Sequence, residues 1–315
     1  MPGLFCGRPG GTGSRTPDAP AAYPAYDRRP MPGWFCGRPG GAGSRTPDAL
    51  RWPGLRGDRV GRISRPEGRC IRHWHWLGPW PVGDGETVEM NERRSPPGPL
   101  YHDFAWLGMP TKQLPGIYAR NQQAKAPVLA AYVLTAFARL RCRGHGAISF
   151  AELFCADGFY ALLAAHYGAA RSIGYDDDRE GHLANAERMR DLLGLKQTSF
   201  RRQRIEDIAP QERADVVANV GGLYHVDDPE AVLDLSYRMA NHYLIVQTVV
   251  SLARNDADYF ERPAPGLSWG NRFSRASFDR LIRSRGWHIV DTLFNTLDGN
   301  PRPEDRGSLY YLIEK

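Results

Sequence analysis

The residues of this chain that are best suited to chemistry lie in two short stretches near its middle. Residues 152–158 read Glu-Leu-Phe-Cys-Ala-Asp-Gly and separate an apolar run from an apolar helical pattern. The second stretch ends in Asp176, 18 residues after Gly158. Small residues in such a loop let the backbone approach a ligand at the edge of a sheet, and an acid after the next strand can accept ribose hydroxyls. These stretches predict a nucleoside site.

The charge of these stretches selects among nucleoside ligands. A dinucleotide site would carry G-x-G-x-x-G to bind a pyrophosphate, and residues 152–158 do not match it. Glu152 and Asp157 would also repel phosphate. A sulfonium with an ammonium group suits acidic walls better. This favours S-adenosyl-L-methionine over a nicotinamide cofactor and excludes a dehydrogenase.

Alternating strands and helices must position these stretches. From residue 146 onward, apolar runs alternate with helical patterns. We predict strands at 148–155, 171–175, 199–205, 214–220, 243–250, 289–294 and 309–313, and helices at 160–167, 180–193, 229–239 and 277–285. Such alternation is typical of a doubly wound, mainly parallel α/β sheet. The last two strands follow one helix in quick succession, which fits a final strand that inserts antiparallel.

Motifs across this region resemble those of class I S-adenosylmethionine-dependent methyltransferases. They are Glu152-x-Phe-x-Ala-x-Gly158, Gly174-Tyr-Asp176 and Ile205-Glu206. The segment 221–229, Gly-Gly-Leu-Tyr-His-Val-Asp-Asp-Pro, is similar to the G-x-L-Y-H segment of the tRNA uridine 5-oxyacetic acid carboxymethyltransferases and their uncharacterised relatives. The likeness covers about residues 118–310. It implies a Rossmann-like methyltransferase sheet of seven strands.

The resemblance also implies roles for individual residues. The cofactor-binding set, carried over by position, is Glu152, Phe154, Gly158, Asp176, Asp178, Ile205, Glu206 and Val220. Within it, the two aspartates would hold the ribose, and Ile205 and Glu206 would flank adenine. Tyr224 and His225 are the candidate catalytic residues. Lys125 and Arg306 match basic residues that surround the donor in the carboxymethyl subgroup, and no metal site is expected.

Several of these positions have a structural alternative. Phe154 and Ala156 stand where the superfamily usually has glycine, so Phe154 is expected either to narrow the methionine pocket or to shield the sulfonium with its ring. The acids 176–178 could cap the next helix, and Tyr224 could be a core residue. His225 precedes a helix start at 228–229, Asp-Pro. A structural role for His225 is therefore as well supported as a role as general base.

The expected function is methyl transfer from S-adenosyl-L-methionine to an unidentified acceptor, a small molecule or RNA. RNA is the less favoured acceptor. Arginines that could meet its phosphates are more commonly part of a solvated face, and they stand at 201, 202, 204, 280, 283 and 285. Carboxymethyl transfer to a tRNA wobble uridine is the first alternative, and it needs a basic pocket for the extra carboxylate. A non-catalytic nucleoside-binding scaffold is the second, and Phe154 and Ala156 motivate it.

The N-terminal part differs in composition from the rest. Residues 1–19 and 31–49 are near copies, and 25 of residues 1–70 are Gly or Pro, a composition typical of disorder. Residues 1–72 hold 13 Arg and 5 acidic residues, a net +8, which leaves −2 for the remaining chain. The basic charge therefore says little about partners of the folded part. We predict a disordered tail at 1–70, an aromatic-rich extension packing on the core at 71–140, with a helix at 118–141, and the methyltransferase domain at 141–315.

The same composition gives an expected compartment. No run approaches the ~20 apolar residues of a membrane helix, and Pro and Gly interrupt the N-terminal stretch where a signal core would lie. The five cysteines show no paired metal spacing. We expect a cytoplasmic protein with no membrane contact. The oligomeric state is left open.

The tail prediction has a direct test. We expect deletion of residues 1–70 to leave the thermal midpoint nearly unchanged, because a Gly- and Pro-rich segment buries too little apolar surface to offset its chain entropy. Thermal melts of the full chain and of the deletion variant measure this. A fall of many degrees on truncation would mean that the tail packs on the domain.

Overall fold

The computed structural model describes residues 96–262 and 270–315. The predictions for the tail at 1–70, and for the first part of the extension, lie outside the described residues. None of the helices in the described part has the length and apolarity that a membrane crossing requires.

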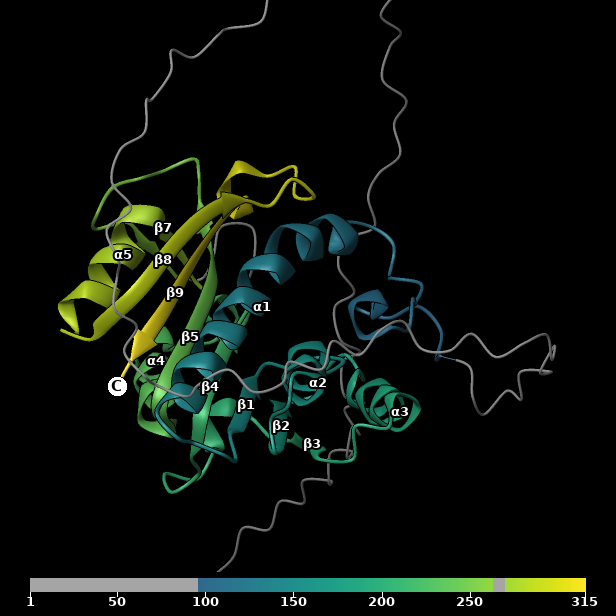
Figure 1. The fold of residues 1–315 in the computed structure, drawn as a ribbon. Helices are drawn as coiled ribbons and strands as arrows, with labels where there is room; N and C mark the ends of the chain where they lie inside the picture. The colour runs from purple at the N-terminus through teal and green to yellow at the C-terminus, as the bar shows by residue number, and fades with distance from the viewer. Residues whose placement is uncertain (1–95, 263–269) are drawn as a thin grey trace, which may run out of the picture. The chain divides into compact units, whose positions relative to one another are not determined.

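A mainly parallel sheet forms the centre of the described chain (Figure 1). Its strands are β1 (Ser149–Leu153), β2 (Arg171–Asp176), β3 (Thr198–Arg202), β4 (Ala214–Val220), β5 (Ala240–Ser251), β6 (Phe260–Glu261), β7 (Arg272–Ser274), β8 (His288–Thr296) and β9 (Gly307–Glu314). Strands β3-β2-β1-β4-β5 are parallel in that order. Strand β9 lies between β5 and β8 and is antiparallel to both.

This order confirms the doubly wound, Rossmann-like sheet and the antiparallel insertion of the last strand. All seven predicted strands are present, and β6 and β7 extend the nine-stranded sheet of the described residues. These two strands span two and three residues. Runs this short carry no alternation that could identify them from the sequence.

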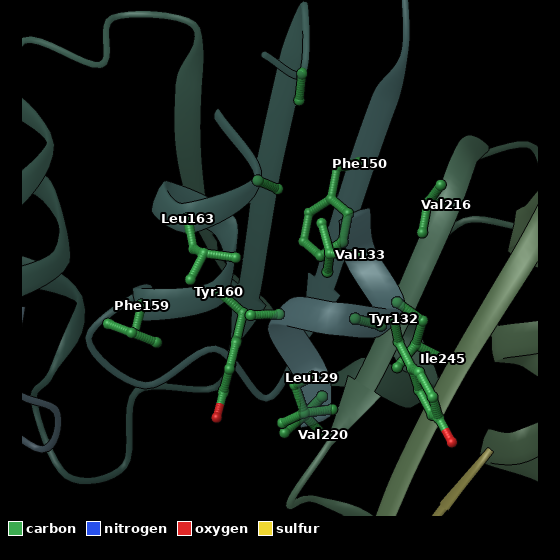
Figure 2. Packing of buried hydrophobic residues seen from close by; sticks show 14 of the residues in the cluster. Leu129, Tyr132, Val133, Phe150, Phe159, Tyr160, Leu163, Val216, Val220 and Ile245 are labelled. Carbon is green, nitrogen blue, oxygen red and sulfur yellow. The ribbon is translucent and has the colours of Figure 1, made fainter. Parts of the chain in front are cut away.

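Within the described residues, α-helices cover the two faces of the sheet: α1 (Tyr118–Cys142), α2 (Phe159–His166), α3 (Leu183–Leu193), α4 (Pro229–Met239) and α5 (Arg275–Ser284). Helices α1, α2 and α3 pack on one face, and α4 and α5 pack on the other. Figure 2 shows the first face, where α1 and α2 meet β1, β4 and β5 through Leu129, Tyr132, Val133, Phe159, Tyr160, Leu163, Phe150, Val216, Val220 and Ile245.

The edge at which β1 and β4 end is where the connections diverge. The chain after β1 continues into α2 on one face, and the chain after β4 continues into α4 on the other. Neighbouring parallel strands whose connections leave in opposite directions create a crevice at their carboxyl ends, which is where ligands bind in open α/β sheets. Residues 154–158 and 221–225 therefore flank the switch point.

Candidate functional site

The loop after β1 keeps a glycine-like backbone although two of its residues carry side chains. Phe154, Ala156 and Gly158 have φ values of 62°, 46° and 76°. This left-handed region disfavours residues with a Cβ, at a cost of roughly 1–3 kcal/mol per residue. It also explains why β1 ends at Leu153, two residues earlier than predicted. The backbone path that glycines usually provide is thus present at the switch point.

Asp176 holds this loop in place from the end of β2. One carboxylate oxygen accepts a hydrogen bond from the backbone N–H of Ala156 at 2.9 Å, and the other accepts from the N–H of Asp178 at 2.8 Å. Burial raises the pKa of the Asp176 carboxyl, and the two backbone bonds oppose this rise. Each oxygen retains a second lone pair. Asp176 can therefore accept bonds from a ligand while it supports the loop.

Asp178 has a different local role. Its φ is 59°, and its carboxylate accepts the N–H of Leu183, the first residue of α3, at 2.9 Å. An acceptor at this position satisfies one of the free N–H groups of a helix start. Of the three acids, Asp178 thus fulfils the capping alternative, and Asp176 is the one aimed at the loop.

The acidic walls expected from Glu152 and Asp157 are not open walls. Glu152 is 1% exposed and accepts the N–H of Ala161 at 2.7 Å, and burial raises its pKa well above the usual range. Asp157 is 0% exposed and accepts two hydrogen-bonding groups of His102, the backbone N–H at 2.8 Å and Nδ1 at 2.6 Å. The prediction that these two carboxyls form acidic walls open to a ligand is therefore wrong, because both are enclosed by the protein.

His102 ties the extension to the first loop, a contact that sequence reasoning missed. Its ring stacks on Phe159 at a centroid distance of 5.0 Å. The next residue, Asp103, exchanges backbone hydrogen bonds with the side-chain amide of Gln122 in α1. The described part of the extension therefore packs beside the loop that carries Asp157. Asp157 and His102 are 55 residues apart in sequence, so no local pattern indicates the pair.

The ring of Phe154 lies against Gly222, between the ends of β1 and β4. A Cβ at Gly222 would come within 1.9 Å of the ring. Only glycine fits there, and Phe154 itself is half-buried. The ring of Phe154 therefore lies at the switch point, and whether it narrows a methionine pocket or shields a sulfonium stays a prediction.

Three polar groups converge over Gly221, and we call Lys125, Tyr224 and Gln247 the Gly221 cluster. A Cβ at Gly221 would lie 3.7 Å from Gln247 Oε1, 3.8 Å from the Tyr224 hydroxyl and 3.9 Å from Lys125 Nζ. The three side chains come from β5, from the 3-10 turn η4 (Leu223–His225) and from α1. The resemblance indicated Lys125 and Tyr224 separately, and it did not predict that they lie over the same glycine or that Gln247 joins them.

Lys125 is a buried cation without a counter-ion in the described part of the chain. It is 6% exposed, and burial alone lowers its pKa to about 8. Within residues 96–262 and 270–315 no carboxylate forms an ion pair with it, and Gln247 Oε1 is buried without a hydrogen-bond partner. Burying an unpaired charge is costly. The Gly221 cluster is therefore suited to receive a polar or anionic ligand group.

His225 is half-buried beside Tyr224, with ring centroids 4.2 Å apart. Burial is the main cause that lowers its pKa to about 4. The imidazole is therefore neutral near pH 7 and a weak proton acceptor, because an efficient general base has a pKa close to the working pH. The structure favours the structural role of His225 over the role as base.

The remaining predicted residues are placed as follows. The side chain of Ile205 is buried in the core on the α4 face, whereas Glu206 is exposed and lies 3.7 Å from Arg204. Val220 ends β4 and is 6% exposed. Arg306 is exposed, with Asp298 at 3.6 Å, so the expected pair of basic residues consists of one buried and one exposed side chain. In the described chain, no three His, Cys, Asp or Glu residues are grouped to hold a metal ion.

No family model and no curated protein matches this chain. Solved structures with a similar fold include the N-terminal domain of EvdMO1 with SAH bound, at 20% identity over 58% of this chain and 80% of that one, TM-score 0.43. Magnesium protoporphyrin IX methyltransferase from Synechocystis PCC 6803 with bound SAH is 15% identical over 59% and 83%, TM-score 0.43. The [4+2]-cyclase SpnF is 16% identical over 59% and 80%, TM-score 0.46. At such identities, the function of this chain depends on its own residues.

The burial of Lys125 predicts a pH-dependent effect. The pKa of Lys125 is about 8 in the folded chain and 10.5 in the unfolded chain. Between these pH values the unfolded chain therefore binds more protons than the folded chain. The cost of the charge, about 3 kcal/mol for this difference in pKa, is therefore complete below pH 8 and is relieved as the pH rises toward 10.5. We expect Lys125→Met to raise the free energy of unfolding at pH 7, and the gain to shrink by pH 10. Denaturant unfolding at both pH values measures it.

Lys112→Met is the matched control, because Lys112 is exposed. It removes the same charge and should show no comparable gain. A loss of stability in Lys125→Met at pH 7 would show that the ammonium has a stabilising partner in the free protein.

Proposed function

We propose that this chain is an S-adenosyl-L-methionine-dependent methyltransferase that acts on an acceptor still to be identified. The observation that carries the proposal is the bridge from Asp176 to the loop after β1. It combines a carboxylate at the end of β2 with a loop of alternating positive φ at the switch point. This combination suits a nucleoside that carries no phosphate.

The residues at this edge suit two parts of S-adenosyl-L-methionine, its nucleoside and its sulfonium. Asp176 keeps lone pairs for the ribose hydroxyls, and the exposed Glu206 lies after β3, where an adenine amine would need an acceptor. The half-buried ring of Phe154 lies at the switch point, where an aromatic ring can attract a cation. When bound, S-adenosyl-L-methionine supplies an electrophilic methyl group.

The chain's own contribution to the reaction is alignment. Tyr224 carries its phenol over Gly221, beside Lys125 and Gln247. A phenol can both donate and accept a hydrogen bond, so Tyr224 can orient an acceptor. Fixing two reactants at near-attack distance accounts for a large part of many rate enhancements. The low pKa of His225 leaves little acid–base assistance from that side.

Asp176 provides the first test. We expect Asp176→Ala to weaken binding of S-adenosyl-L-methionine by about 10- to 100-fold, because hydrogen bonds to a charged group contribute roughly 1.5–3 kcal/mol. Titration calorimetry measures the affinity. Asp177→Ala is the control, since Asp177 is the adjacent acid and pairs with Arg179 rather than with the loop. If Asp176→Ala binds S-adenosyl-L-methionine as tightly as Asp177→Ala does, Asp176 is not part of the binding site.

Tyr224 tests the reaction centre. Tyr224→Phe keeps the ring and removes one hydrogen bond. We expect turnover to fall about tenfold or more, for a lost transition-state contact of ~1.4 kcal/mol, with nearly normal thermal stability. Turnover with an identified acceptor and a thermal melt measure the two quantities. Lower stability with unchanged activity per folded molecule would make Tyr224 a core residue.

Carboxymethyl transfer is a second candidate, and Lys125 favours it. An additional carboxylate on the donor would meet a buried ammonium that lacks a counter-ion in the described chain. A charge-assisted bond of this kind is strong. Mass spectrometry of the small molecule that co-purifies with the protein separates the two candidates. A carboxyl-bearing S-adenosyl species would select carboxymethyl transfer, and S-adenosyl-L-methionine or its demethylated product would select methyl transfer.

A further inference from the structure

Asn271 donates hydrogen bonds to the turn that carries Tyr224. The side-chain amide of Asn271 donates to the carbonyl oxygens of Leu223 at 2.7 Å and of Val226 at 2.9 Å. The backbone N–H of Asn271 donates to the carbonyl oxygen of Tyr224 at 3.1 Å. One residue thus satisfies the carbonyls of three of the four residues 223–226.

The contact is close and buried. Asn271 is 2% exposed. The preceding Gly270 has a φ of 80°, and a Cβ there would lie 2.4 Å from the carbonyl oxygen of Tyr224. Glycine is needed at 270 because of both the left-handed backbone and this approach. The segment 270–271 is therefore fitted to η4 by shape as well as by hydrogen bonds.

The turn needs such support because its own bonding is sparse. At η4, the backbone N–H of His225 donates to the carbonyl oxygen of Gly222 at 2.9 Å. A 3-10 turn of three residues has poor hydrogen-bond geometry on its own. Buried carbonyl groups without partners are costly. The three bonds from Asn271 supply what the turn lacks.

We propose that Asn271 is a positioning residue that keeps the phenol of Tyr224 in the Gly221 cluster by fixing η4. The proposal rests on the proposed function for the role it gives to Tyr224. The side-chain amide of Asn271 donates to the carbonyl oxygens of Leu223 and Val226, which belong to the turn and not to the Gly221 cluster. Its action on the reaction therefore passes through the position of Tyr224.

Asn219 supplies the matched control. It is also a fully buried asparagine, at 0% exposure, and its amide donates to the hydroxyl of Ser236 in α4 at 2.9 Å. Asn219→Ala thus removes a buried side-chain hydrogen bond from the same domain without removing any bond to η4. Both variants should lower the thermal midpoint, so loss of stability alone does not distinguish them.

The experiment reads the position of Tyr224 directly. The full chain is labelled with 3-fluorotyrosine, and the signal of Tyr224 among the 14 tyrosines is identified as the fluorine resonance that Tyr224→Phe removes. In Asn271→Ala we expect this resonance to move toward the value of solvent-exposed fluorotyrosine or to broaden. In Asn219→Ala we expect it to stay in place. If Asn271→Ala does not fold, Asn271→Ser is read by the same criterion.

Two results overturn the proposal: a Tyr224 resonance that is unchanged in the Asn271 variant, or one that moves equally in the Asn219 variant. These are read in the free protein. A separate arm adds S-adenosyl-L-methionine to the labelled wild-type chain, where we expect the Tyr224 resonance to shift. A wild-type resonance that does not respond would count against the proposed function, whereas the hold of Asn271 on the turn is decided without donor.

Discussion

The hydrogen bond between the Asp176 carboxylate and the backbone N–H of Ala156 is the interaction on which the candidate site depends. It joins the end of β2 to a loop in which Phe154 and Ala156 occupy a left-handed backbone region. Side chains make that conformation costly, and the bond from Asp176 helps to hold it. Because a carboxylate oxygen has two lone pairs, the same group can shape the loop and still bind a ligand. A substitution at Asp176 therefore acts on both.

Buried charged side chains differ in whether they have a partner of opposite charge, and this difference distinguishes Lys125 from the buried groups that support the fold. Asp157 is buried against His102, and Arg272, at 5% exposure, bonds twice to Asp305 at 2.6 and 3.0 Å. Such pairing is what burial of ionisable groups requires. Lys125 departs from it in the described chain, with a pKa lowered to about 8 by burial alone. Perturbed groups of this kind cluster at functional sites, and for this reason we propose the Gly221 cluster as the reacting end.

The sequence predicted the features that depend on near neighbours in the chain. Alternating apolar runs located seven of the strands, and the spacing from Gly158 to Asp176 indicated the loop after β1 and the end of β2. Contacts between distant segments were beyond such patterns. The Gly221 cluster joins positions 125, 224 and 247, and the fit of Phe154 against Gly222 depends on the packing of β1 beside β4. Periodicity describes which face of an element is buried, and it does not identify the residue on the opposite side.

The groups around the reacting end limit the kind of acceptor that the site can serve. His225 is a weak base because burial disfavours its charged form. Burial lowers the pKa of Lys125 in the Gly221 cluster to about 8, so its ammonium changes charge close to physiological pH. An acceptor that loses its proton easily, or one that is already anionic, would find the ammonium of Lys125 as its counter-ion. An acceptor that holds its proton tightly would need a stronger base than these residues provide. The proposed site therefore contributes alignment and charge compensation, and the hydrogen bonds from Asn271 to the turn of Tyr224 would serve the alignment.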